Sequence, residues 1–475
     1  MKAFRLLGHI GGRLRTRGLA TSAVAWIAAG QMSAQVAVVH QMGRITPGED
    51  GTVAVTLTGS ASAGFKSYFD LFPIERSRDL KAWFPLATLT RTNALGGDLE
   101  FVDDAMGEGR GFYRTPTNIL ATPLPPLAGP YPVGTFSRLL TDPARTNLVR
   151  HTNQQFMVTF WHPAAPAAGS LPGAYVDAKL IARLNSFYGF SVSPAFVGHA
   201  WPNAPLATNG SAWPVVLYSP SANSHRRENI YKVEELASHG FVVVGMDHRD
   251  TFMSVFPDGK LVSGQAIKEP TDGASLSTLM TPLLDRVADA QVTLDEVARM
   301  NAEDPEWAGR LDLDRIGVLG FSIGGATAAQ LCKLEPRCRA GLGMDGLFID
   351  PQLLATPLDK PFLFLRSDTA EVNLPNGPPD DRLPIIEAMI HDGYFIQISG
   401  TVHWSYSDVP LLASPAAFRA GFGSPRHPVL TGARVNQITA AYVLAFFRKY
   451  LRGTDDHLLD GPPPEFPEVL KYVKR

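Results

Sequence analysis

Short apolar runs separated by turn-rich stretches characterise the first quarter of the chain, between residues 35 and 118. No helical period appears in this part, and short strands at such spacing are typical of a small β-sandwich. The pattern therefore predicts an all-β, sandwich-like accessory domain over residues 35–118, with a role as a spacer or as a surface-binding module. The strand-like runs are 52–58, 83–89, 99–102 and 111–114.

From about residue 129 onward, near-continuous apolar runs alternate with amphipathic stretches. Strands are predicted at 214–219, 241–246, 315–320, 340–344, 361–365 and 394–398. Helices are predicted near 228–239, 282–300, 323–334, 382–391 and 432–452. Such alternation indicates a mostly parallel sheet with helices on both faces, which is the α/β class. A Pro-rich linker at 119–128 joins the two parts.

The helix near 282–300 illustrates the pattern. Its apolar residues are spaced by four, three, four and three positions, which places them on one helical face. These residues are Leu283, Val287, Ala290, Leu294 and Val297. This helix is therefore expected to cover one face of the sheet.

The N-terminus has the pattern of an export signal. Five basic residues precede an uncharged, apolar stretch at 19–32, and the small residues Ser33 and Ala34 follow. We predict a signal peptide over residues 1–34, which implies a secreted, periplasmic or cell-surface protein; an uncleaved anchor is the alternative. No later stretch reaches the length of about 20 apolar residues that a membrane span needs.

Composition narrows the class of protein. Hydrophobic residues make up 45% and charged residues 19% of the 475 positions, which is a core-forming composition. The net charge of −2 gives no reason to expect nucleic acid as a partner. The only cysteines, Cys332 and Cys338, form a disulfide or remain two buried thiols, and without clustered histidines they do not make a zinc site. The oligomeric state stays open.

The sequence GFSIG at residues 320–324 matches the nucleophile elbow G-x-S-x-G. A predicted strand precedes it and a predicted helix follows it, which is the context that such an elbow requires. Glycines flank Ser322 because the turn brings backbone segments too close for a Cβ atom. Ser322 is therefore predicted to be a catalytic nucleophile.

A serine nucleophile needs a base and an orienting acid, which follow it in the order Ser, acid, His in this architecture. His403 lies just after the predicted strand at 394–398, at the edge of the sheet where ligands bind, and is predicted to be the base. Asp345 and Asp368 each follow a strand, so position alone leaves both open as the acid.

The tetrahedral oxyanion of acyl transfer requires two N–H donors. We predict these to be the backbone amides of Ile323 and Ala222, the latter in the loop after the strand at 214–219. Phe321 and Trp404 flank the serine and the histidine and are candidates for an apolar acyl pocket, with ordinary core packing as the alternative.

The last 345 or so residues resemble the platelet-activating factor acetylhydrolase family (plasma and intracellular type II). The matching segments are VLYSP at 216–220, LASHGFVV at 236–243, DHRD at 247–250, GFSIGGAT at 320–327, LGMDG at 342–346 and GTVH at 400–403. The resemblance implies a calcium-independent α/β-hydrolase, without cofactor or metal, that acts on short acyl esters. The family's acid lies 23 residues after the serine, as Asp345 does here (345 − 322 = 23), so the resemblance favours Asp345 over Asp368.

Two further features bear on this resemblance. The family's glycine-containing oxyanion loop is replaced here by Ser221, Ala222 and Asn223, and residues 247–250 are expected to form a structural hydrogen-bonding cluster. The N-terminal part resembles an immunoglobulin- or fibronectin-like module of exported bacterial proteins, on the segments SRDLKAW at 77–83, PLAT at 85–88, LEFVD at 99–103 and FYR at 112–114.

The expected function is thus hydrolysis of short-chain acyl esters by Ser322, His403 and Asp345 through an acyl-enzyme. A Pro/Ala/Gly-rich insertion at 163–212 lines the substrate entrance or wraps the surface. Two alternatives remain: a polyester hydrolase that uses the β-domain as an anchor, and a surface-binding protein whose hydrolase domain is vestigial.

Overall fold

The computed structural model describes most of the C-terminal part and six strands of the N-terminal part. The described residues are 40–47, 53–59, 70–77, 84–91, 99–103, 112–114, 124–147, 151–190, 192, 196–210, 212–268, 277–346, 349–350, 352–368, 382–413, 418, 422 and 430–475. The chain divides into one unit of residues 1–121 and 185–195 and another of residues 122–184 and 196–475. The predicted signal peptide and the first residues of the predicted linker lie outside the described residues.

The described residues of the first unit form two antiparallel sheets of three strands each. One has the order β1-β2-β5 and the other β4-β3-β6. The strands are β1 (His40–Pro47), β2 (Val53–Gly59), β3 (Asp70–Ser77), β4 (Phe84–Arg91), β5 (Leu99–Asp103) and β6 (Phe112–Arg114). Classification of this part as an immunoglobulin-like sandwich stays a prediction, as do the predicted domain boundaries.

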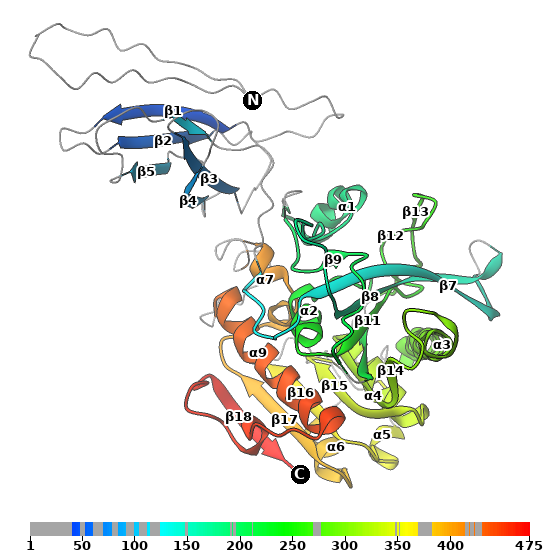
Figure 1. The fold of residues 1–475 in the computed structure, drawn as a ribbon. Coiled ribbons are helices and arrows are strands. Elements are labelled where there is room, and N and C mark those ends of the chain that lie inside the picture. The colour runs from blue at the N-terminus through cyan, green and yellow to red at the C-terminus, as the bar shows by residue number, and fades with distance from the viewer. Residues whose placement is uncertain are drawn as a thin grey trace, which may run out of the picture. The chain divides into compact units, whose positions relative to one another are not determined.

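A mixed sheet of ten strands forms the centre of the second unit, in the order β18-β17-β16-β15-β14-β10-β11-β8-β7-β9 (Figure 1). The six strands from β11 to β17 run parallel, whereas β8 and β18 pair antiparallel with them. The strands are β7 (Val133–Asn147), β8 (Thr152–Pro163), β9 (Trp201–Pro202), β10 (Trp213–Ser219), β11 (Val242–Met246), β14 (Leu311–Phe321), β15 (Cys338–Met344), β16 (Phe362–Ser367), β17 (Gly393–Ile398) and β18 (Val469–Lys474). A separate hairpin joins β12 (Ser254–Val255) and β13 (Leu261–Val262).

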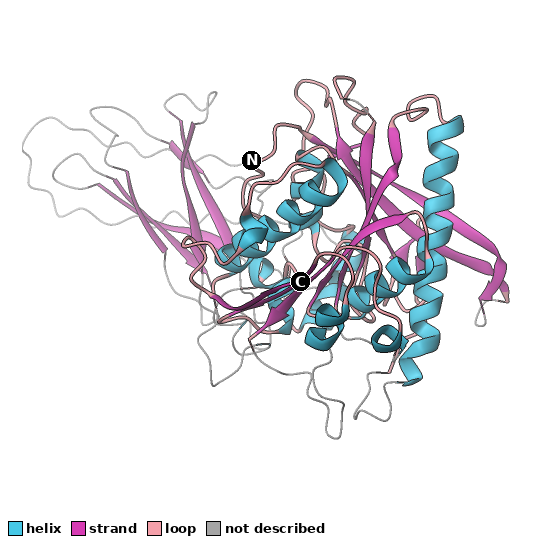
Figure 2. Ribbon diagram, turned by 90° about the horizontal axis from the view of Figure 1, so that it is seen from below, coloured by secondary structure: helices cyan, strands magenta, loops and turns pink. Residues whose placement is uncertain are grey.

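Helices cover both faces of this sheet (Figures 1 and 2). Helices α3 and α4 pack against each other on one face, and α2 and α9 pack against each other on the opposite face. The helices are α1 (Ala178–Tyr188), α2 (Ile230–Ser238), α3 (Met280–Glu303), α4 (Ile323–Leu334), α5 (Gln352–Ala355), α6 (Arg382–Ala388), α7 (Val409–Leu412) and α9 (Gly432–Phe447), the last continued by a π-helical turn at Arg448–Arg452.

The core lies between the central strands and their helices. Strands β10 and β11 are buried along their whole length, which explains why they appear in the sequence as continuous apolar runs. The five apolar residues predicted to form one face of α3 are all buried. Because the sheet is buried on both faces, a shift of any strand along its axis would expose apolar side chains and cost free energy. Burial therefore fixes where the strand ends lie.

Each of the six predicted strands and five predicted helices of the second unit exists, with bounds shifted by a few residues. The sequence analysis missed β7, β8 and β18. The run FMVTFW at 156–161 in β8 and the alternation VLKYVK at 469–474 in β18 are signals that could have revealed two of them. In the described residues, no helix combines the length and hydrophobicity that crossing a bilayer requires.

Candidate active site

Ser322 occupies the sharp turn between β14 and α4. Its backbone has φ 58° and ψ −124°, a conformation that residues other than glycine rarely adopt and that is strained. A Cβ atom at Gly320 would lie 1.9 Å from the carbonyl oxygen of Gly324, and one at Gly324 would lie 2.0 Å from that of Ser219. The turn therefore requires both glycines, as the elbow motif predicts.

Although they are far apart in the sequence, Ser322 and Asp345 each lie within hydrogen-bond distance of His403. His403 Nε2 is 3.0 Å from Ser322 Oγ, and His403 Nδ1 is 2.7 Å from Asp345 Oδ2. His403 begins a short 3₁₀ turn after β17, and its side chain is 21% exposed. The structure thus brings together the three residues predicted to be catalytic.

Asp345 is held firmly in place after β15. It is 1% exposed, and it accepts hydrogen bonds from Arg366 Nη1 at 2.8 Å and from the amide and hydroxyl of Ser367 at 2.9 and 3.0 Å. Asp368, the alternative acid, instead accepts a hydrogen bond from the amide of Gly400 at 3.0 Å. Asp345 is therefore the carboxylate that the structure brings to His403.

Of the two amides predicted to hold the oxyanion, that of Ile323 directly follows Ser322, whereas that of Ala222 comes from the loop after β10, far earlier in the chain. Ala222 packs against the same apolar cluster that contains Ile323. In the part of the chain that the structure describes, neither amide donates to another protein group. Ile323 is the first residue of α4, where helical N–H groups have no partner within the helix. Both donors are thus available to a ligand.

A buried network shapes the loop that carries Ala222. Arg286, on α3, donates to the carbonyl oxygens of Pro220 at 2.8 Å and Ser221 at 3.0 Å. Glu228 accepts hydrogen bonds from the amide of Ser221 at 2.8 Å and from its hydroxyl at 2.6 Å. The peptide groups on the N-terminal side of Ala222 are therefore fixed by side chains that sequence analysis did not single out.

The same loop is held on its other side by Asp250. This carboxylate forms an ion pair with Arg286 and accepts a hydrogen bond from the amide of Asn223. The backbone of Asn223 is in the left-handed region, with φ 57°. Burial opposes ionisation of Asp250, but the Arg286 guanidinium outweighs it and lowers its pKa. Burial raises the pKa of Glu228, although Ser221 partly offsets the effect. The loop is thus fixed by one ionised and one strongly desolvated carboxyl group.

A second Ser–His–Asp arrangement lies behind the loop. Ser219 Oγ is 2.9 Å from His248 Nε2, and His248 Nδ1 is 2.9 Å from Asp289 Oδ2. The three residues are at most 3% exposed, and Asp289 also pairs with Arg145. The expected hydrogen-bonding cluster at 247–250 is thus part of a larger buried network, whose member Asp289 on α3 the sequence analysis did not identify.

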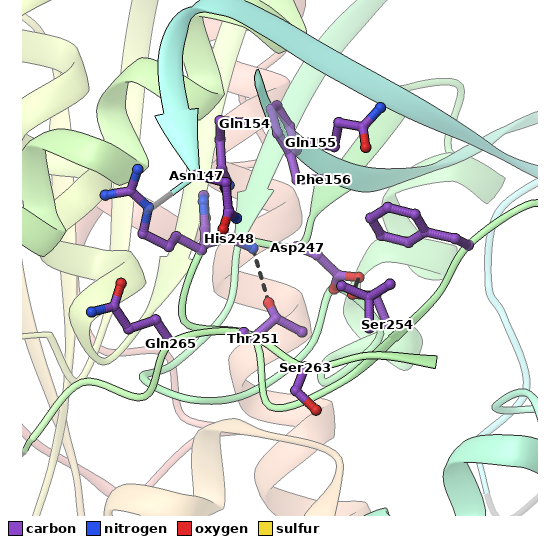
Figure 3. A pocket seen from close by; sticks show the side chains of 14 residues that line it. Asn147, Gln154, Gln155, Phe156, Asp247, His248, Thr251, Ser254, Ser263 and Gln265 are labelled. Carbon is purple, nitrogen blue, oxygen red and sulfur yellow. Dashed lines mark hydrogen bonds between the residues drawn. The ribbon is translucent and has the colours of Figure 1, made fainter. Parts of the chain in front are cut away.

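Figure 3 shows a small pocket beside this network. His248 donates its amide hydrogen to Thr251 Oγ1 at 2.9 Å, and Ser254 donates to Asp247, which also pairs with Arg226. Neither Ser322 nor His403 lines this pocket. It is therefore distinct from the candidate active site.

The two predicted aromatic pocket residues surround His403. The Phe321 ring lies 4.8 Å from the imidazole and the Trp404 ring 6.2 Å from it, measured between centroids. Phe321 is fully buried and Trp404 is partly exposed. Phe321 therefore supports the imidazole, whereas Trp404 can contact a ligand.

Cys332 and Cys338, expected as a disulfide or as two buried thiols, are both buried, with their sulfurs 2.8 Å apart and no bond between them in the structure. Which of the two states the protein adopts stays a prediction. Among the described residues, one group has the spacing of metal ligands: Asp455, His457 and Asp460. All three are exposed on the surface, and His457 and Asp460 already contact each other.

Comparison with known proteins supports the resemblance drawn from sequence. Residues 119–257 match the family model of platelet-activating factor acetylhydrolase, isoform II. This range contains the loop with Ala222 and ends before Ser322. Over 269 residues the chain is 27% identical to a probable 1-alkyl-2-acetylglycerophosphocholine esterase of Arthroderma benhamiae, covering 54% of this chain and 65% of that protein.

A platelet-activating factor acetylhydrolase of Cavia porcellus is 24% identical over 322 residues, covering 60% of this chain and 69% of the relative. Among solved structures, a ferulic acid esterase from Streptomyces cinnamoneus matches with a TM-score of 0.58 and 26% identity, covering 74% of this chain and 98% of the esterase. The chain thus has an α/β-hydrolase-like fold, and the comparisons, which find similarity to platelet-activating factor acetylhydrolases and to an esterase, support a serine ester hydrolase.

Proposed function

We propose that this chain is an exported serine hydrolase that cleaves short-chain acyl esters through an acyl-enzyme. The observation that supports the proposal most is the continuous hydrogen-bonded series from Ser322 through His403 to Asp345, at a strained turn beside two unpaired amides. Each element of acyl transfer has a candidate in this arrangement: a nucleophile, a base, an orienting acid and oxyanion donors.

The proposed reaction has two halves. His403 Nε2 accepts the hydroxyl proton of Ser322 while Ser322 Oγ attacks the ester carbonyl, and the amides of Ile323 and Ala222 stabilise the oxyanion. His403 then donates that proton to the leaving alcohol, and the acyl group remains on Ser322. In the second half, His403 deprotonates a water molecule that attacks the acyl-enzyme and releases the acid.

Asp345 keeps Nδ1 of His403 protonated and stabilises the imidazolium that forms in both halves. Its position is maintained by Arg366 and Ser367, which leave Oδ2 directed at the histidine. No cofactor or metal takes part in this scheme, as the family resemblance implies.

The substrate class is tested by comparing esters. The relatives' names point to an acetyl ester of a glycerophospholipid, and the structural relative's title points to an aromatic acyl ester. We expect 4-nitrophenyl acetate to be cleaved faster than the corresponding butyrate and octanoate, with a feruloyl ester as the comparison. Faster turnover of the feruloyl ester would transfer the proposal to aromatic acyl groups.

The chemistry itself is tested with an organophosphonate. Mass spectrometry is expected to find one label on Ser322, together with loss of esterase activity. A protein that binds surfaces but neither hydrolyses the nitrophenyl esters nor reacts with the phosphonate would favour the vestigial alternative. Degradation of insoluble polyester that depends on residues 35–118 would favour the polymer alternative.

A further inference from the structure

A cavity of about 440 Å³ lies within the second unit, apart from the candidate active site. It is formed by residues of β7 and β8, by α2 and the residues 225–227 before it, by residues 255–257, and by two stretches of the insertion at 163–212. Its volume falls within the range of small-molecule sites, roughly 300–1,000 Å³. Neither Ser322 nor His403 lines it.

Much of the cavity wall is apolar. Met157, Val176, Leu180 and Ile230 all line it, and each is at most 5% exposed. An apolar wall of this kind favours an alkyl chain over a sugar or a nucleotide, because burial of the chain removes hydrocarbon from water while leaving no polar group unpaired.

The lining also includes a cation, Arg227, that forms no ion pair within the described residues. Arg227 donates from Nη1 to the carbonyl oxygens of Ala174 and Tyr175, both at 3.2 Å, and its Nε is buried without a hydrogen-bond partner in the described residues. No carboxylate among those residues lies within ion-pair distance of it. Burial, followed by repulsion from Arg226, lowers the pKa of Arg227 to about 10, although Glu234 and Asp177 partly offset the effect.

The other charged groups of the lining are already engaged. Arg226 pairs with Asp247. Glu234 accepts the amides of His199 and Ala200 at 2.9 and 3.3 Å and contacts the His199 ring at 3.1 Å. Asp177 is exposed at the rim and accepts the amide of Lys179. Arg227 is therefore the charged residue of the lining that can form an ion pair with a ligand.

A second polar atom lacks a partner in the same wall. Thr135 is 5% exposed, and its hydroxyl has no hydrogen-bond partner in the described part of the chain. Buried polar groups without partners are rare in folded proteins, and each calls for an explanation such as a ligand. Thr135 and Arg227, the residues that carry these two enclosed atoms, both contribute to the lining of the cavity.

From this juxtaposition we propose that the cavity binds an amphipathic carboxylate, with its carboxylate at Arg227 and its alkyl chain along Met157, Val176, Leu180 and Ile230. A carboxylate has the acceptor geometry that a guanidinium prefers, and its charge compensates that of the partly buried Arg227. The site is separate from the proposed ester hydrolysis and does not depend on it.

The test is calorimetric titration of decanoate, below its micelle concentration, into the full chain with Ser322 blocked by phosphonate. Ser322→Ala protein is titrated in parallel, so that a form with the active-site serine removed is measured even if the phosphonate does not react. We expect one site in both forms. Arg227→Met is expected to weaken binding by at least about tenfold, because a charge-assisted hydrogen bond is lost. Arg183→Met, on an exposed arginine of α1 outside the lining, serves as the matched control and keeps full affinity.

Ala174→Phe provides a second variant, since Ala174 is an exposed lining residue whose enlargement fills the cavity with little risk to folding. It is expected to abolish decanoate binding. Decanol is expected to bind more weakly than decanoate, and acetate not to bind. Equal affinity for decanol and decanoate, or decanoate binding that survives both Arg227→Met and Ala174→Phe, would overturn the proposal, as would the absence of any binding heat.

Discussion

The part of the chain that the structure describes contains two Ser–His–Asp arrangements with nearly the same hydrogen-bond distances, and they differ in the exposure of the serine and histidine and in their surroundings. Ser322, His403 and Asp345 are joined by contacts of 3.0 and 2.7 Å, and Ser219, His248 and Asp289 by contacts of 2.9 and 2.9 Å. In the first set the serine and histidine are partly exposed, whereas the second set is almost completely buried.

Their surroundings differ as well. Ser322 has the strained backbone of an elbow and is followed by the Ile323 amide, which has no protein acceptor among the described residues, whereas Ser219 ends a regular strand and lies 3.4 Å from Arg286 Nη1. A hydrogen-bonded Ser–His–Asp series is therefore insufficient evidence for a catalytic site. Access, backbone strain and oxyanion donors distinguish a reactive serine from one that fills a polar core.

The largest expected difference between the two sets is in turnover after removal of each serine. Ser322→Ala is expected to lower kcat for 4-nitrophenyl acetate by about a million-fold, since nucleophile and base act as a unit. Ser219→Ala removes a partner of His248 and is expected to lower the free energy of unfolding by about 1–3 kcal/mol while retaining most activity. Steady-state kinetics and urea unfolding of both variants measure this.

If Ser219→Ala lost as much activity as Ser322→Ala at unchanged stability, Ser219 would not be a purely structural serine. Phosphonate labelling gives an independent measure, because only an accessible, activated serine reacts.

The acids give the next largest effect. Asp345→Asn is expected to lower kcat by about ten-thousand-fold, because the amide no longer maintains the tautomer of His403 that accepts the serine proton. Asp368→Asn is the matched control at the neighbouring strand end and is expected to retain most activity, since Asp368 contacts Gly400 and Thr401. An inactive Asp368→Asn beside a fully active Asp345→Asn would move the acid to the other strand.

Sequence reasoning could identify the reactive set far better than the buried one. Ser322 can be recognised because the glycines on either side of it are required by the turn itself, which is a local feature of the sequence. The strands around it can be recognised because they are continuous apolar runs, which are typical of buried parallel strands. The choice between Asp345 and Asp368 could not be made from position, because both follow parallel strands. It depends on the path of residues 399–403, which brings Gly400 to Asp368 and His403 to Asp345.

Arg286 and Asp289 could not be identified in this way. On α3 they lie beside the apolar face and have the appearance of ordinary surface charges, and their partners are brought to them only by the loops after β10 and β11. Contacts between residues far apart in sequence leave no local pattern. The pairing of β7 with β8 is a different case, because these strands form a hairpin with Asn147 opposite Thr152, and the run FMVTFW at 156–161 was a local signal for β8.

Arg286 links the two sets, and its removal is expected to affect both. Arg286→Met leaves Asp250 buried without its cation, which should lower the free energy of unfolding by about 3–5 kcal/mol. It also releases the carbonyls of Pro220 and Ser221, so kcat should fall more than KM changes because Ala222 is no longer held. Urea unfolding and kinetics on nitrophenyl acetate measure the two effects.

Arg249→Met is a matched control, because Arg249 pairs with Asp285 where both side chains are about one-fifth exposed. Its loss is expected to cost no more than about 1 kcal/mol. Equal effects of the two substitutions would show that the carbonyl contacts of Arg286 do not position the loop.

The smallest effect expected concerns pH and the buried side of the loop, where His225 lies. Burial, partly offset by Asp247, lowers the pKa of His225 from 6.5 to about 4. Between these values the unfolded chain takes up a proton that the folded protein does not, so the stability due to neutral His225 is present above pH 6.5 and is lost as the pH falls towards 4. The corresponding free energy is about 3 kcal/mol at most.

His225→Phe removes this proton uptake and keeps a ring of similar shape against Phe252. The free energy of unfolding should therefore decrease less steeply in this variant than in the wild type between pH 6.5 and 4, as measured by urea unfolding at each pH. His391→Asn, at an exposed histidine, is the control and should leave the wild-type slope unchanged. Parallel curves for wild type and His225→Phe would mean that His225 is solvated in the folded protein. His248 would then be the remaining example of a buried histidine to compare with the accessible His403. Burial and the charge of Arg286 lower the pKa of His248 as well.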